Sequence, residues 1–380
     1  MFTVIAHDPY SKARAGILYT DHGAVETPVF MPVATQGAIK ALDHRMAEKL
    51  QYKMLLANTY HLYLRPGTEV LRRFGGLHRF MQWSGALLTD SGGFQVYSLD
   101  KLRRVFDGGV EFRSHIDGSR HVFTPWAVIE YQRAIGADVI MVLDECIGYP
   151  MTYQQAKEAM VRSVEWAKES LSAHKQIPFY YSYRQQLFGI VQGGTFFDLR
   201  QACTEQLCQL PFDGFAIGGL AVGEPIPLMY DVVDFSTDLL PPDKPRYLMG
   251  VGSPQNILQA IARGVDMFDC VMPTRNARNG TVFTTQGRIN IRNQRFKYEE
   301  APVEPRWEEL GVEPISLGYL RHLFVAGEIL GLTLATMQNL AFYRWLVRSA
   351  REKILAGTFR QWSGEFLEQF YPDTKVESSF

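Results

Sequence analysis

The 380-residue sequence contains only four cysteines, and no two of them form a CxxC pair. They are Cys146, Cys203, Cys208 and Cys270. Cysteines that are so few and so unevenly spaced exclude a disulfide framework and a four-cysteine zinc site. This usage is typical of a reducing compartment, so we expect the protein to be cytoplasmic.

A charge excess of one sign and long apolar runs are also missing. Lys and Arg number 39 against 40 Asp and Glu, a formal net charge of -1. Any contact with nucleic acid must therefore come from a local basic patch. An apolar run of about 18 residues, the length that suggests a transmembrane helix, does not occur. The segment 1–16 is charged too early for a secretory signal, so we expect neither a membrane span nor export.

What the first 275 positions do contain is a series of eight short apolar runs, each ending in glycine or a polar residue. Such runs are typical of buried parallel strands. They lie at 29–35, 54–59, 86–93, 139–145, 188–194, 214–223, 247–254 and 266–273. Segments with helical periodicity, such as 152–171 and 196–210, separate most of them. This alternation predicts an α/β fold, a (β/α)8 TIM barrel. A doubly wound sheet is the weaker alternative, because no GxGxxG motif follows an early strand.

The character of the chain changes after residue 273. Residues 274–300 are polar and basic, 301–317 are rich in Pro and Glu, and 318–370 have the pattern of two or more helices. No Ser-rich or Gly-rich linker separates these parts, so we expect them to pack on the barrel as one body. The predicted parts are a barrel core carrying the active site, an inserted C-terminal subdomain and closing helices, at 1–273, 274–335 and 336–380.

The polar residues that end the eight runs are predicted to share one location. In a (β/α)8 barrel the C-terminal ends of the strands form the mouth, where the chemistry takes place. The residues expected there are Asn58, Thr59, Asp90, Ser91, Asp144, Glu145, Gln192, Gly218, Gly219, Gly250 and Asp269. Several carboxylates at one mouth indicate a functional site rather than a structural feature.

Two of these carboxylates, Asp90 and Asp269, suit glycosidic chemistry, in which one attacks the anomeric carbon and the other handles protons. Asp90 precedes Gly92 and Gly93, which let the backbone approach a ligand; the alternative is an aspartate that caps a tight turn. Asp269 lies inside an apolar run, where an unpaired carboxylate is costly to bury. It therefore needs either a function or a neutralising partner such as Arg275.

A binding site for a planar base is suggested by the neighbouring runs. Asp144 and Gln192 offer a carboxylate and a bidentate amide, the complement of a purine-like edge, although Gln192 could also satisfy loop backbone. Backbone N–H groups of 218–223 could complete this set. Phe94 and Met249 are candidates to stack on the ring, but such residues at strand ends are more often part of a core.

The stretch from Cys270 to Lys297 carries six basic residues and no acidic one. We interpret it as a phosphate-binding patch beside the mouth rather than as a solvated hairpin face. The six residues are Arg275, Arg278, Arg288, Arg292, Arg295 and Lys297.

Seven segments, in order, resemble the tRNA-guanine transglycosylases, and specifically their bacterial type. They are TDSGGFQV (89–96), FRSHIDGS (112–119), LDEC (143–146), GIVQGG (189–194), AIGGLAVGE (216–224), LMGVGSP (248–254) and FDCVMPTRNARNG (268–280). The resemblance runs from about residue 3 to 355. It implies a glycosyltransferase of queuosine biosynthesis that exchanges guanine 34, the wobble base of tRNAs with a GUN anticodon (Asp, Asn, His and Tyr), for a 7-deazaguanine. The exchange it implies uses no ATP, metal or redox cofactor.

The resemblance also implies roles for individual residues. Asp269 matches the nucleophile that attacks C1′ of the ribose and holds the tRNA as a covalent intermediate. Asp90 matches the general acid/base that deprotonates the incoming base. Asp144, Gln192 and Gly219 match positions that bind the Watson–Crick edge and O6. Leu220 supplies a carbonyl near the 7-substituent, and Phe94 with Met249 matches the stacking pair. The full base-binding set is Ser91, Gly92, Gly93, Phe94, Asp144, Gln192, Gly219, Leu220 and Met249.

Two further sets are implied in the same way. Cys146 and Val222 resemble the bacterial pattern, which is associated with the small aminomethyl base preQ1 rather than with bulky queuine. Segments 250–256 and 274–278 match those that contact the anticodon. The tRNA-binding residues so implied are Gly250, Val251, Gly252, Ser253, Pro254, Gln255, Asn256, Thr274, Arg275, Asn276, Ala277 and Arg278.

The chain departs from the family's pattern at the zinc site. Family members carry a Cys-x-Cys-x2-Cys stretch and a later His, whereas the matching positions here are Trp307, Glu309, Val312 and Gln338. Val cannot coordinate a metal, so we predict that this former zinc-type insertion binds no structural zinc. A mini-core with Trp307, Val312 and Ile315 as candidates would replace the metal. The family's homodimer contact lies close to this part, so a homodimer is one implied assembly.

Other functions remain open at this point. The lost zinc ligands suggest a non-catalytic tRNA-binding subunit of a heteromeric transglycosylase, and queuine salvage is a variant of the exchange reaction. A nucleoside hydrolase or transferase acting on free nucleosides would need no basic patch. The presence of both Asp90 and Asp269 favours an active exchanging enzyme.

Overall fold

Eight short parallel strands form a barrel at the centre of the protein. The computed structural model describes residues 1–99 and 103–371, so the last nine positions of the predicted segment 336–380 lie outside the described residues. The strands are β4 (Val29–Met31), β5 (Met54–Ala57), β6 (Ala86–Thr89), β10 (Val139–Met141), β11 (Gln186–Val191), β12 (Gly214–Ile217), β13 (Arg246–Leu248) and β14 (Met267–Asp269). Each overlaps one of the eight predicted runs. The prediction of an α/β fold with a (β/α)8 barrel is confirmed.

The order of the strands around the barrel decides which residues meet at its mouth. Neighbours follow the order β4, β14, β13, β12, β11, β10, β6 and β5. A parallel bridge between Val33 and Leu56 joins the two ends of this series. As a result β10, β11 and β12 lie side by side, and β6 lies across the barrel from β13.

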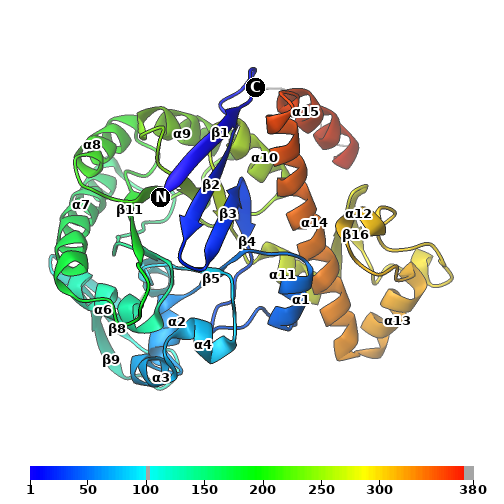
Figure 1. Ribbon diagram of the computed structural model, residues 1–380, viewed down its shortest axis with the longest axis horizontal. Coiled ribbons are helices and arrows are strands. Elements are labelled where there is room, and N and C mark those ends of the chain that lie inside the picture. The colour runs from blue at the N-terminus through cyan, green and yellow to red at the C-terminus, as the bar shows by residue number, and fades with distance from the viewer. Residues whose placement is uncertain (100–102, 372–380) are drawn as a thin grey trace.

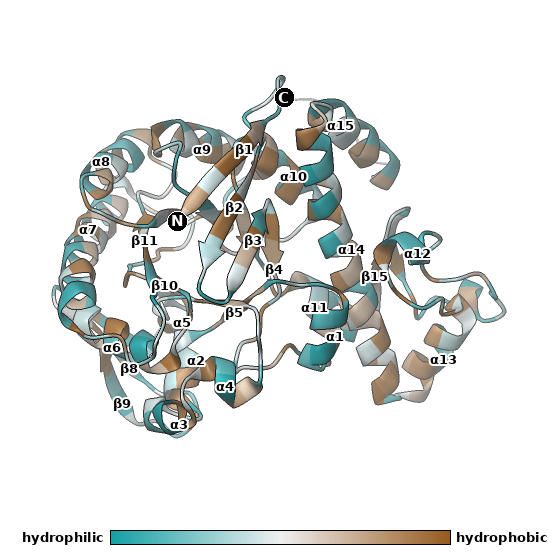
Figure 2. Ribbon diagram, in the orientation of Figure 1, coloured by the Kyte–Doolittle hydropathy of each residue, from teal (hydrophilic) through white to brown (hydrophobic). Residues whose placement is uncertain are grey.

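Helices form a ring outside the barrel, and they carry both hydrophobic and hydrophilic residues (Figures 1 and 2). Because helices cover the sheet, its strands are buried on both faces and are mostly apolar, as in β5 and β6. The outer helices are α6 (Pro125–Ile135), α7 (Tyr153–Gln176), α8 (Phe197–Cys208), α9 (Ile226–Leu239) and α10 (Pro254–Ala262). The periodic segments 152–171 and 196–210 correspond to α7 and α8, and α7 begins with a capping box at Thr152 and Gln155.

Short helices connect the first strands of the barrel. They are α1 (His44–Lys49), α2 (Thr59–Leu64), α3 (Thr68–Phe74), α4 (Leu77–Met81) and α5 (Gly93–Tyr97). A single residue separates α2 from β5, and only three separate α5 from β6, which keeps both helices near the mouth.

Two small antiparallel sheets lie outside the barrel and were not anticipated from the sequence. One consists of β1 (Phe2–His7), β2 (Arg14–Thr20) and β3 (Gly23–Thr27), the other of β7 (Arg103–Phe106), β8 (Gly109–Arg113) and β9 (Arg120–Phe123). The first sheet lies across one end of the barrel (Figure 1). Arg14 anchors it there, donating to both carboxylate oxygens of Asp266 at 2.9 and 2.6 Å, just before β14 begins. This end is therefore the N-terminal end, opposite the mouth.

The C-terminal part is held together by one long helix. It comprises α11 (Met272–Arg278), β15 (Thr281–Thr284), β16 (Gly287–Asn290), η2 (Gln294–Phe296), α12 (Trp307–Leu310), α13 (Leu317–Ala326), α14 (Ile329–Leu355) and α15 (Phe359–Phe370). The boundary expected between residues 335 and 336 falls inside α14. Tyr343 of this helix packs against Phe30 of the barrel with ring centres 4.8 Å apart, and Phe342 packs against Phe283 of the insertion. One continuous helix thus contacts both parts.

Among the described residues, no helix combines the length and the apolar character that a membrane crossing would require.

Candidate active site

A pocket of about 510 Å³ opens at the C-terminal ends of the barrel strands. Its size is that of a small-molecule site. Six of the eight strand ends contribute residues that the sequence had placed at the mouth or that the family resemblance had implied to be functional. Those residues are Asn58, Asp90, Ser91, Phe94, Asp144, Cys146, Gly218, Gly219, Leu220, Val222, Met249, Gly250, Asp269 and Arg275.

Asp269 ends β14 and presents one carboxylate oxygen to the pocket. Its Oδ1 accepts hydrogen bonds from the hydroxyl of Tyr247 at 2.6 Å and from the backbone N–H of Gly250 at 2.9 Å. From the described residues, Oδ2 receives no hydrogen bond, and Arg275 forms no ion pair with this carboxylate. Burial raises the pKa of Asp269, while the two donors act against this rise. The arrangement leaves a lone carboxylate oxygen free to attack an electrophile.

Asp90 follows β6 and is held by the loop that follows the neighbouring strand β5. Asn58 donates its amide to Oδ2 at 2.5 Å, and the backbone N–H of Thr59 donates to Oδ1 at 2.8 Å. The carboxylate thus binds the loop after β5 and does not cap its own turn. Burial raises the pKa of Asp90 to about 6, the charge of Asp269 acts in the same direction, and the bonds from Asn58 and Thr59 oppose them. A carboxyl group with this pKa exchanges protons near neutral pH.

Asp144 lies at the centre of a second polar group, contributed by three adjacent strands. Ser91 donates its hydroxyl to Oδ1 of Asp144 at 2.9 Å, and Gln192 donates its side-chain amide to Oδ2 at 2.8 Å. Burial raises the pKa of Asp144, and these two hydrogen bonds oppose the rise. A Cβ on Gly93 would lie 2.7 Å from the backbone oxygen of Asp144, so glycine is needed at that position. Gln192 is buried behind Asp144 rather than lining the pocket.

The loop after β12 supplies backbone groups to the same side of the pocket. Gly219 has a φ of +67°, and a Cβ there would collide with Oε1 of Gln192. The carboxylate of Glu224 accepts hydrogen bonds from the backbone N–H groups of Ala221 and Val222 and so fixes the loop. Leu220 and Val222 line the pocket from this loop.

Phe94 and Met249 face the pocket from opposite sides of the barrel. Phe94 belongs to α5 after β6, Met249 follows β13, and both line the pocket. The Phe94 side chain is 51% exposed, so it is not part of the hydrophobic core. This placement suits two apolar groups that would stack on the faces of a planar ring.

Cys146 lines the pocket beyond Asp144. Burial raises the pKa of its thiol to about 12, so the thiol is uncharged at neutral pH. Cys146 and Val222 together make this part of the pocket uncharged.

Arg275 is the basic residue that reaches the pocket itself, and it is exposed. None of the six cations of the basic stretch forms an ion pair with an acidic residue of the described chain. Arg278 donates to the backbone oxygen of Thr274 at 2.8 Å. These charges remain available to phosphate groups.

The residues implied to bind tRNA are not equally accessible. Gly250 and Arg275 are exposed, and Ser253, Gln255, Asn256, Asn276 and Arg278 are partly exposed. The remaining five are buried: Val251, Gly252, Pro254, Thr274 and Ala277. Any contribution of these five to a ligand contact would have to be indirect or arise after a movement.

Three residues expected at the mouth, Thr59, Glu145 and Gln192, do not line the pocket, and one functional residue was missed. Glu145 forms an ion pair with Arg162 of α7 at 2.6 Å and does not line the pocket, because successive residues of an extended chain point to opposite sides. Tyr247, which orients Asp269, was not singled out. A polar hydroxyl within the apolar run 247–254 was the available signal.

The side chains at the positions that replace the family's zinc ligands make other contacts. Glu309 accepts a hydrogen bond from the indole N–H of Trp345 at 2.6 Å, Gln338 donates to the backbone oxygen of Phe283 at 3.2 Å, and the Val312 side chain is buried. In the described part of this subdomain, no three His, Cys, Asp or Glu side chains come together. The residues present therefore do not fit a structural zinc ion.

A buried carboxylate occupies this region instead. Glu304 accepts hydrogen bonds from the backbone N–H of Thr285 at 2.9 Å, from its hydroxyl at 2.7 Å and from the backbone N–H of Arg306 at 2.9 Å. Gln338 adds a longer bond of 3.4 Å. Trp307 and Val312 pack in the main hydrophobic core, whereas Ile315 packs against a separate core of the insertion. The mini-core candidates are thus divided between two clusters, and a polar network accompanies them.

Comparison with known proteins gives a consistent result. The family model described as "Queuine tRNA-ribosyltransferase" matches residues 8–372. A queuine tRNA-ribosyltransferase of Caldanaerobacter subterraneus subsp. tengcongensis is 51% identical over 370 residues, which cover 97% of each chain. Proteins of the same name from Thermoanaerobacter pseudethanolicus and Solibacter usitatus are 48% identical over 369 residues and 51% identical over 363 residues. The former alignment covers 97% of both chains, and the latter covers 94% of this chain and 95% of the relative.

Proposed function

Because the chain belongs to the queuine tRNA-ribosyltransferase family, whose members are glycosyltransferases, we propose that it exchanges guanine 34 of GUN-anticodon tRNAs for a 7-deazaguanine. The base taken up is preQ1, and the reaction proceeds through a covalent bond between Asp269 and the ribose. This proposal is supported by the presence of two carboxyl groups with different properties in one pocket. Asp269 has a free oxygen, and Asp90 in the same pocket has a pKa of about 6.

The first half-reaction begins with the free oxygen Oδ2 of Asp269. It forms a bond to C1′ of the ribose while the bond between C1′ and N9 of guanine breaks, and the electron pair of that bond leaves with the purine. A proton from Asp90 neutralises the departing base. Hydrogen bonds from Tyr247 and Gly250 hold Oδ1, so the carboxylate keeps one orientation during the attack.

The second half-reaction is the reverse of the first with a different base. Asp90, now ionised, takes the N9 proton of the incoming deazaguanine, whose nitrogen attacks C1′ and releases the carboxylate of Asp269. Both halves interconvert a glycosidic bond and an ester-like bond, so the exchange requires no ATP, metal or redox cofactor.

The base is held by the polar group around Asp144. Its carboxylate accepts N–H groups of the purine edge, while Gln192 and the backbone at Gly219 address O6. Phe94 and Met249 stack on the two faces of the ring. The uncharged Cys146 and Val222 leave room for a small aminomethyl group, which would meet the backbone oxygen of Leu220.

The tRNA is bound through the basic stretch, which reaches the pocket at Arg275. Arg275 lies at the pocket wall, where it can contact the phosphates around the wobble nucleotide. A cytoplasmic location and a homodimer belong to the same proposal.

The test is to incubate the full-length protein with labelled guanine and a tRNA that has a GUN anticodon. We expect label to enter the tRNA, and this incorporation to be lost in Asp269→Ala but kept in the control Asp117→Asn, an exposed aspartate outside the pocket. A protein–tRNA adduct that survives denaturation should form with the wild-type protein and not with Asp269→Ala. Competition between preQ1 and queuine would identify the preferred base.

The other outcomes of this experiment separate the alternatives. Binding of tRNA without exchange would identify a non-catalytic subunit, and activity on free guanosine would identify a nucleoside hydrolase or transferase. Either result would overturn the proposed function.

A further inference from the structure

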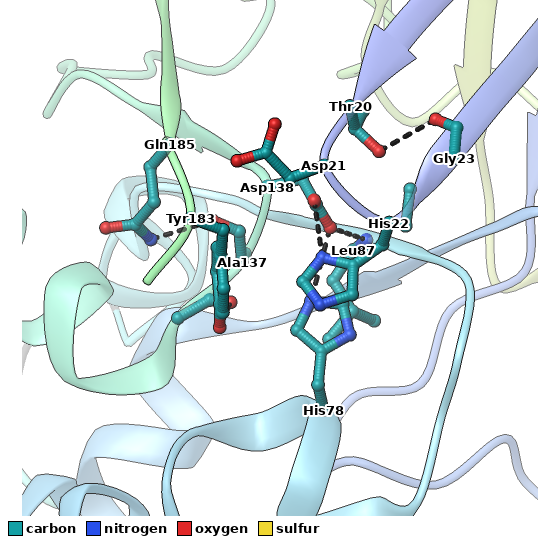
Figure 3. A network of polar contacts seen from close by, with 12 residues as sticks. Thr20, Asp21, His22, Gly23, His78, Leu87, Ala137, Asp138, Tyr183 and Gln185 are labelled. Atoms are coloured by element: carbon teal, nitrogen blue, oxygen red, sulfur yellow. Dashed lines mark hydrogen bonds and ion pairs between the residues drawn. The ribbon is translucent and has the colours of Figure 1, made fainter. Parts of the chain in front are cut away.

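Three side chains with metal-binding chemistry meet at the end of the barrel opposite the active site. His22 lies in the turn between β2 and β3, His78 in α4, and Asp138 directly before β10 (Figure 3). The backbone N–H of Leu87 donates to Oδ2 of Asp138 at 2.8 Å, and the backbone oxygen of Asp138 accepts from Gln186 at 2.7 Å. Asp138 is therefore fixed to three neighbouring strands of the barrel.

The ligand atoms of this trio lie close together. Nδ1 of His22 is 2.7 Å from Oδ1 of Asp138, and Nε2 of His78 is 3.2 Å from Oδ2. All of the candidate ligand atoms lie within 4.8 Å of one another. In the described part of the chain, this is the one group of three or more His, Cys, Asp and Glu side chains with that property.

The hydrogen bonds of His78 leave a basic nitrogen facing the carboxylate. Its Nδ1 lies 3.3 Å from the backbone oxygen of Trp83, which can only accept, so Nδ1 carries the proton. In the neutral ring Nε2 then carries a lone pair. This atom is buried, and it makes no hydrogen bond of regular geometry although Oδ2 of Asp138 lies 3.2 Å away. A lone pair and a carboxylate oxygen 3.2 Å apart repel each other unless a positive charge lies between them.

We propose that His22, His78 and Asp138 form a binding site for a divalent transition-metal ion of the zinc type. Two imidazoles and one carboxylate suit Zn²⁺, Co²⁺ or Ni²⁺, whereas Ca²⁺ and Mg²⁺ prefer oxygen ligands alone. The backbone contacts of His78 and Asp138 hold two of the three ligands in place, as outer-shell hydrogen bonds do in metal sites. Three protein ligands leave a coordination position for water.

Metal binding requires one ring to turn. The rings of His22 and His78 are stacked, with centres 3.6 Å apart and an angle of 13° between their planes (Figure 3). A metal ion lies in the plane of each imidazole that binds it, and two nearly parallel planes do not meet at one ion. His22 is the ring that turns, because it lies in a surface turn and is 22% exposed, whereas His78 is 6% exposed.

The consequence of binding is a link between the N-terminal sheet and the barrel. His22 is carried by the β2–β3 turn, whereas Asp138 belongs to the barrel and His78 to the connection between β5 and β6. An ion bound only by the folded protein raises the free energy of unfolding in proportion to the logarithm of its concentration. This site is separate from the former zinc-type insertion and from the catalytic pocket, so its presence does not depend on the proposed function.

The test is a titration of the chelator-treated, dialysed full-length protein with Zn²⁺ by calorimetry, and with Co²⁺ by visible absorption. We expect one equivalent to bind and the thermal midpoint to rise with added Zn²⁺. His22→Gln and Asp138→Asn should each weaken binding by at least about 10-fold. The matched control is His322→Gln, which alters an exposed histidine of α13 and should bind as the wild type does.

Failure of the proposal has a distinct signature. If no saturable binding of one equivalent occurs, or if binding is unchanged in His22→Gln, the trio is not a metal site and a shared proton supplies the positive charge. His22→Gln lies in a surface turn, so it tests the proposal even if Asp138→Asn does not fold. The guanine-exchange assay should give wild-type rates for His22→Gln, which separates this result from a failure at the catalytic pocket.

Discussion

The hydroxyl of Tyr247 donates a hydrogen bond of 2.6 Å to Oδ1 of Asp269, on the adjacent strand of the barrel. The backbone N–H of Gly250 donates to the same oxygen, so both donors bind Oδ1. The other oxygen, Oδ2, is thereby left without a hydrogen bond from the described residues and faces the pocket. A nucleophile needs such an oxygen, because each hydrogen bond to it would lower its basicity.

Replacement of Tyr247 by Phe tests this relationship. Loss of a hydrogen bond to a charged group costs about 1.5–3 kcal/mol, so adduct formation should slow roughly 10- to 150-fold if the loss is felt in the transition state. Tyr52→Phe is the control, since it removes a buried hydroxyl that donates to the backbone oxygen of Leu340 far from the pocket. Single-turnover formation of the tRNA adduct is the measurement. An unchanged rate in Tyr247→Phe would show that the hydrogen bond does not orient the nucleophile.

The pKa of Asp90 predicts how the exchange depends on pH. The carboxylate form must accept the proton of the incoming base, and the pKa of Asp90 is about 6. The rate of the second half-reaction should therefore rise as the pH increases through about 6 and then level off. Asn58→Ala removes a hydrogen bond that lowers this pKa, so the rising limb should move to higher pH. A limb that stays in place in Asn58→Ala would assign it to another group.

A methyl group at Gly219 should disturb the base site. Gly219→Ala introduces a left-handed backbone strain of about 1–2 kcal/mol and also a collision with Oε1 of Gln192. The KM for guanine should rise, because Gln192 has to move away from Asp144. Gly327→Ala carries a similar strain, at a φ of +77°, but meets nothing within 4 Å, so it should lower stability without raising KM. Equal KM values in the two variants would contradict the role of the Gly219–Gln192 contact.

Arg275 should contribute to tRNA affinity in a salt-dependent way. Arg275→Gln removes an exposed cation from the pocket wall, so it should weaken tRNA binding and reduce the slope of log K against log salt by about 1. The matched variant Arg348→Gln removes a cation of α14 that is paired with Glu352 at 2.9 Å, and it should leave the slope as it is. Filter binding at several salt concentrations measures both. The idea is refuted if the two variants have the same slope.

Glu304 should stabilise the insertion in place of a metal. Glu304→Ala leaves the two donors of Thr285 and the N–H of Arg306 without their acceptor, so the free energy of unfolding should fall by at least about 2 kcal/mol. Glu308→Ala, at a neighbouring exposed position, should change it by less than about 0.5 kcal/mol. Denaturant unfolding in the His22→Gln background, with and without chelator, keeps the proposed metal site out of the comparison. A chelator-induced loss of stability in that background would point to a metal in the insertion.

The strands of the barrel could be predicted because of the environment in which they lie. Parallel strands covered by helices are buried on both faces, so each leaves a continuous apolar run in the sequence, as in Met54–Ala57. The small outer sheets leave no such signal. In β1 and β7 buried or partly buried residues alternate with exposed ones over only a few positions, which is too short to separate from a loop.

The sequence alone also did not determine on which side of the chain a polar residue lies. Asp144 and Glu145 were both expected at the mouth, but only Asp144 faces the pocket, and Glu145 pairs with Arg162 of α7. Their difference depends on the direction of each side chain at the end of β10. Alternation along the chain separates the two side chains, and contacts with α7 decide which of them turns away: Arg162 pairs with the carboxylate of Glu145, and Ser163 accepts from its backbone N–H.

The sequence by itself determined the barrel, the strand ends that carry polar residues, and the family to which the chain belongs, because these depend on local composition and motifs. Only the tertiary structure decided which oxygen of Asp269 is free, why the pKa of Asp90 lies near 6, and that His22 meets Asp138. Each of these depends on contacts between residues far apart in the chain; His22 and Asp138 are 116 positions apart. Such contacts leave no local pattern, since folding alone brings their partners together.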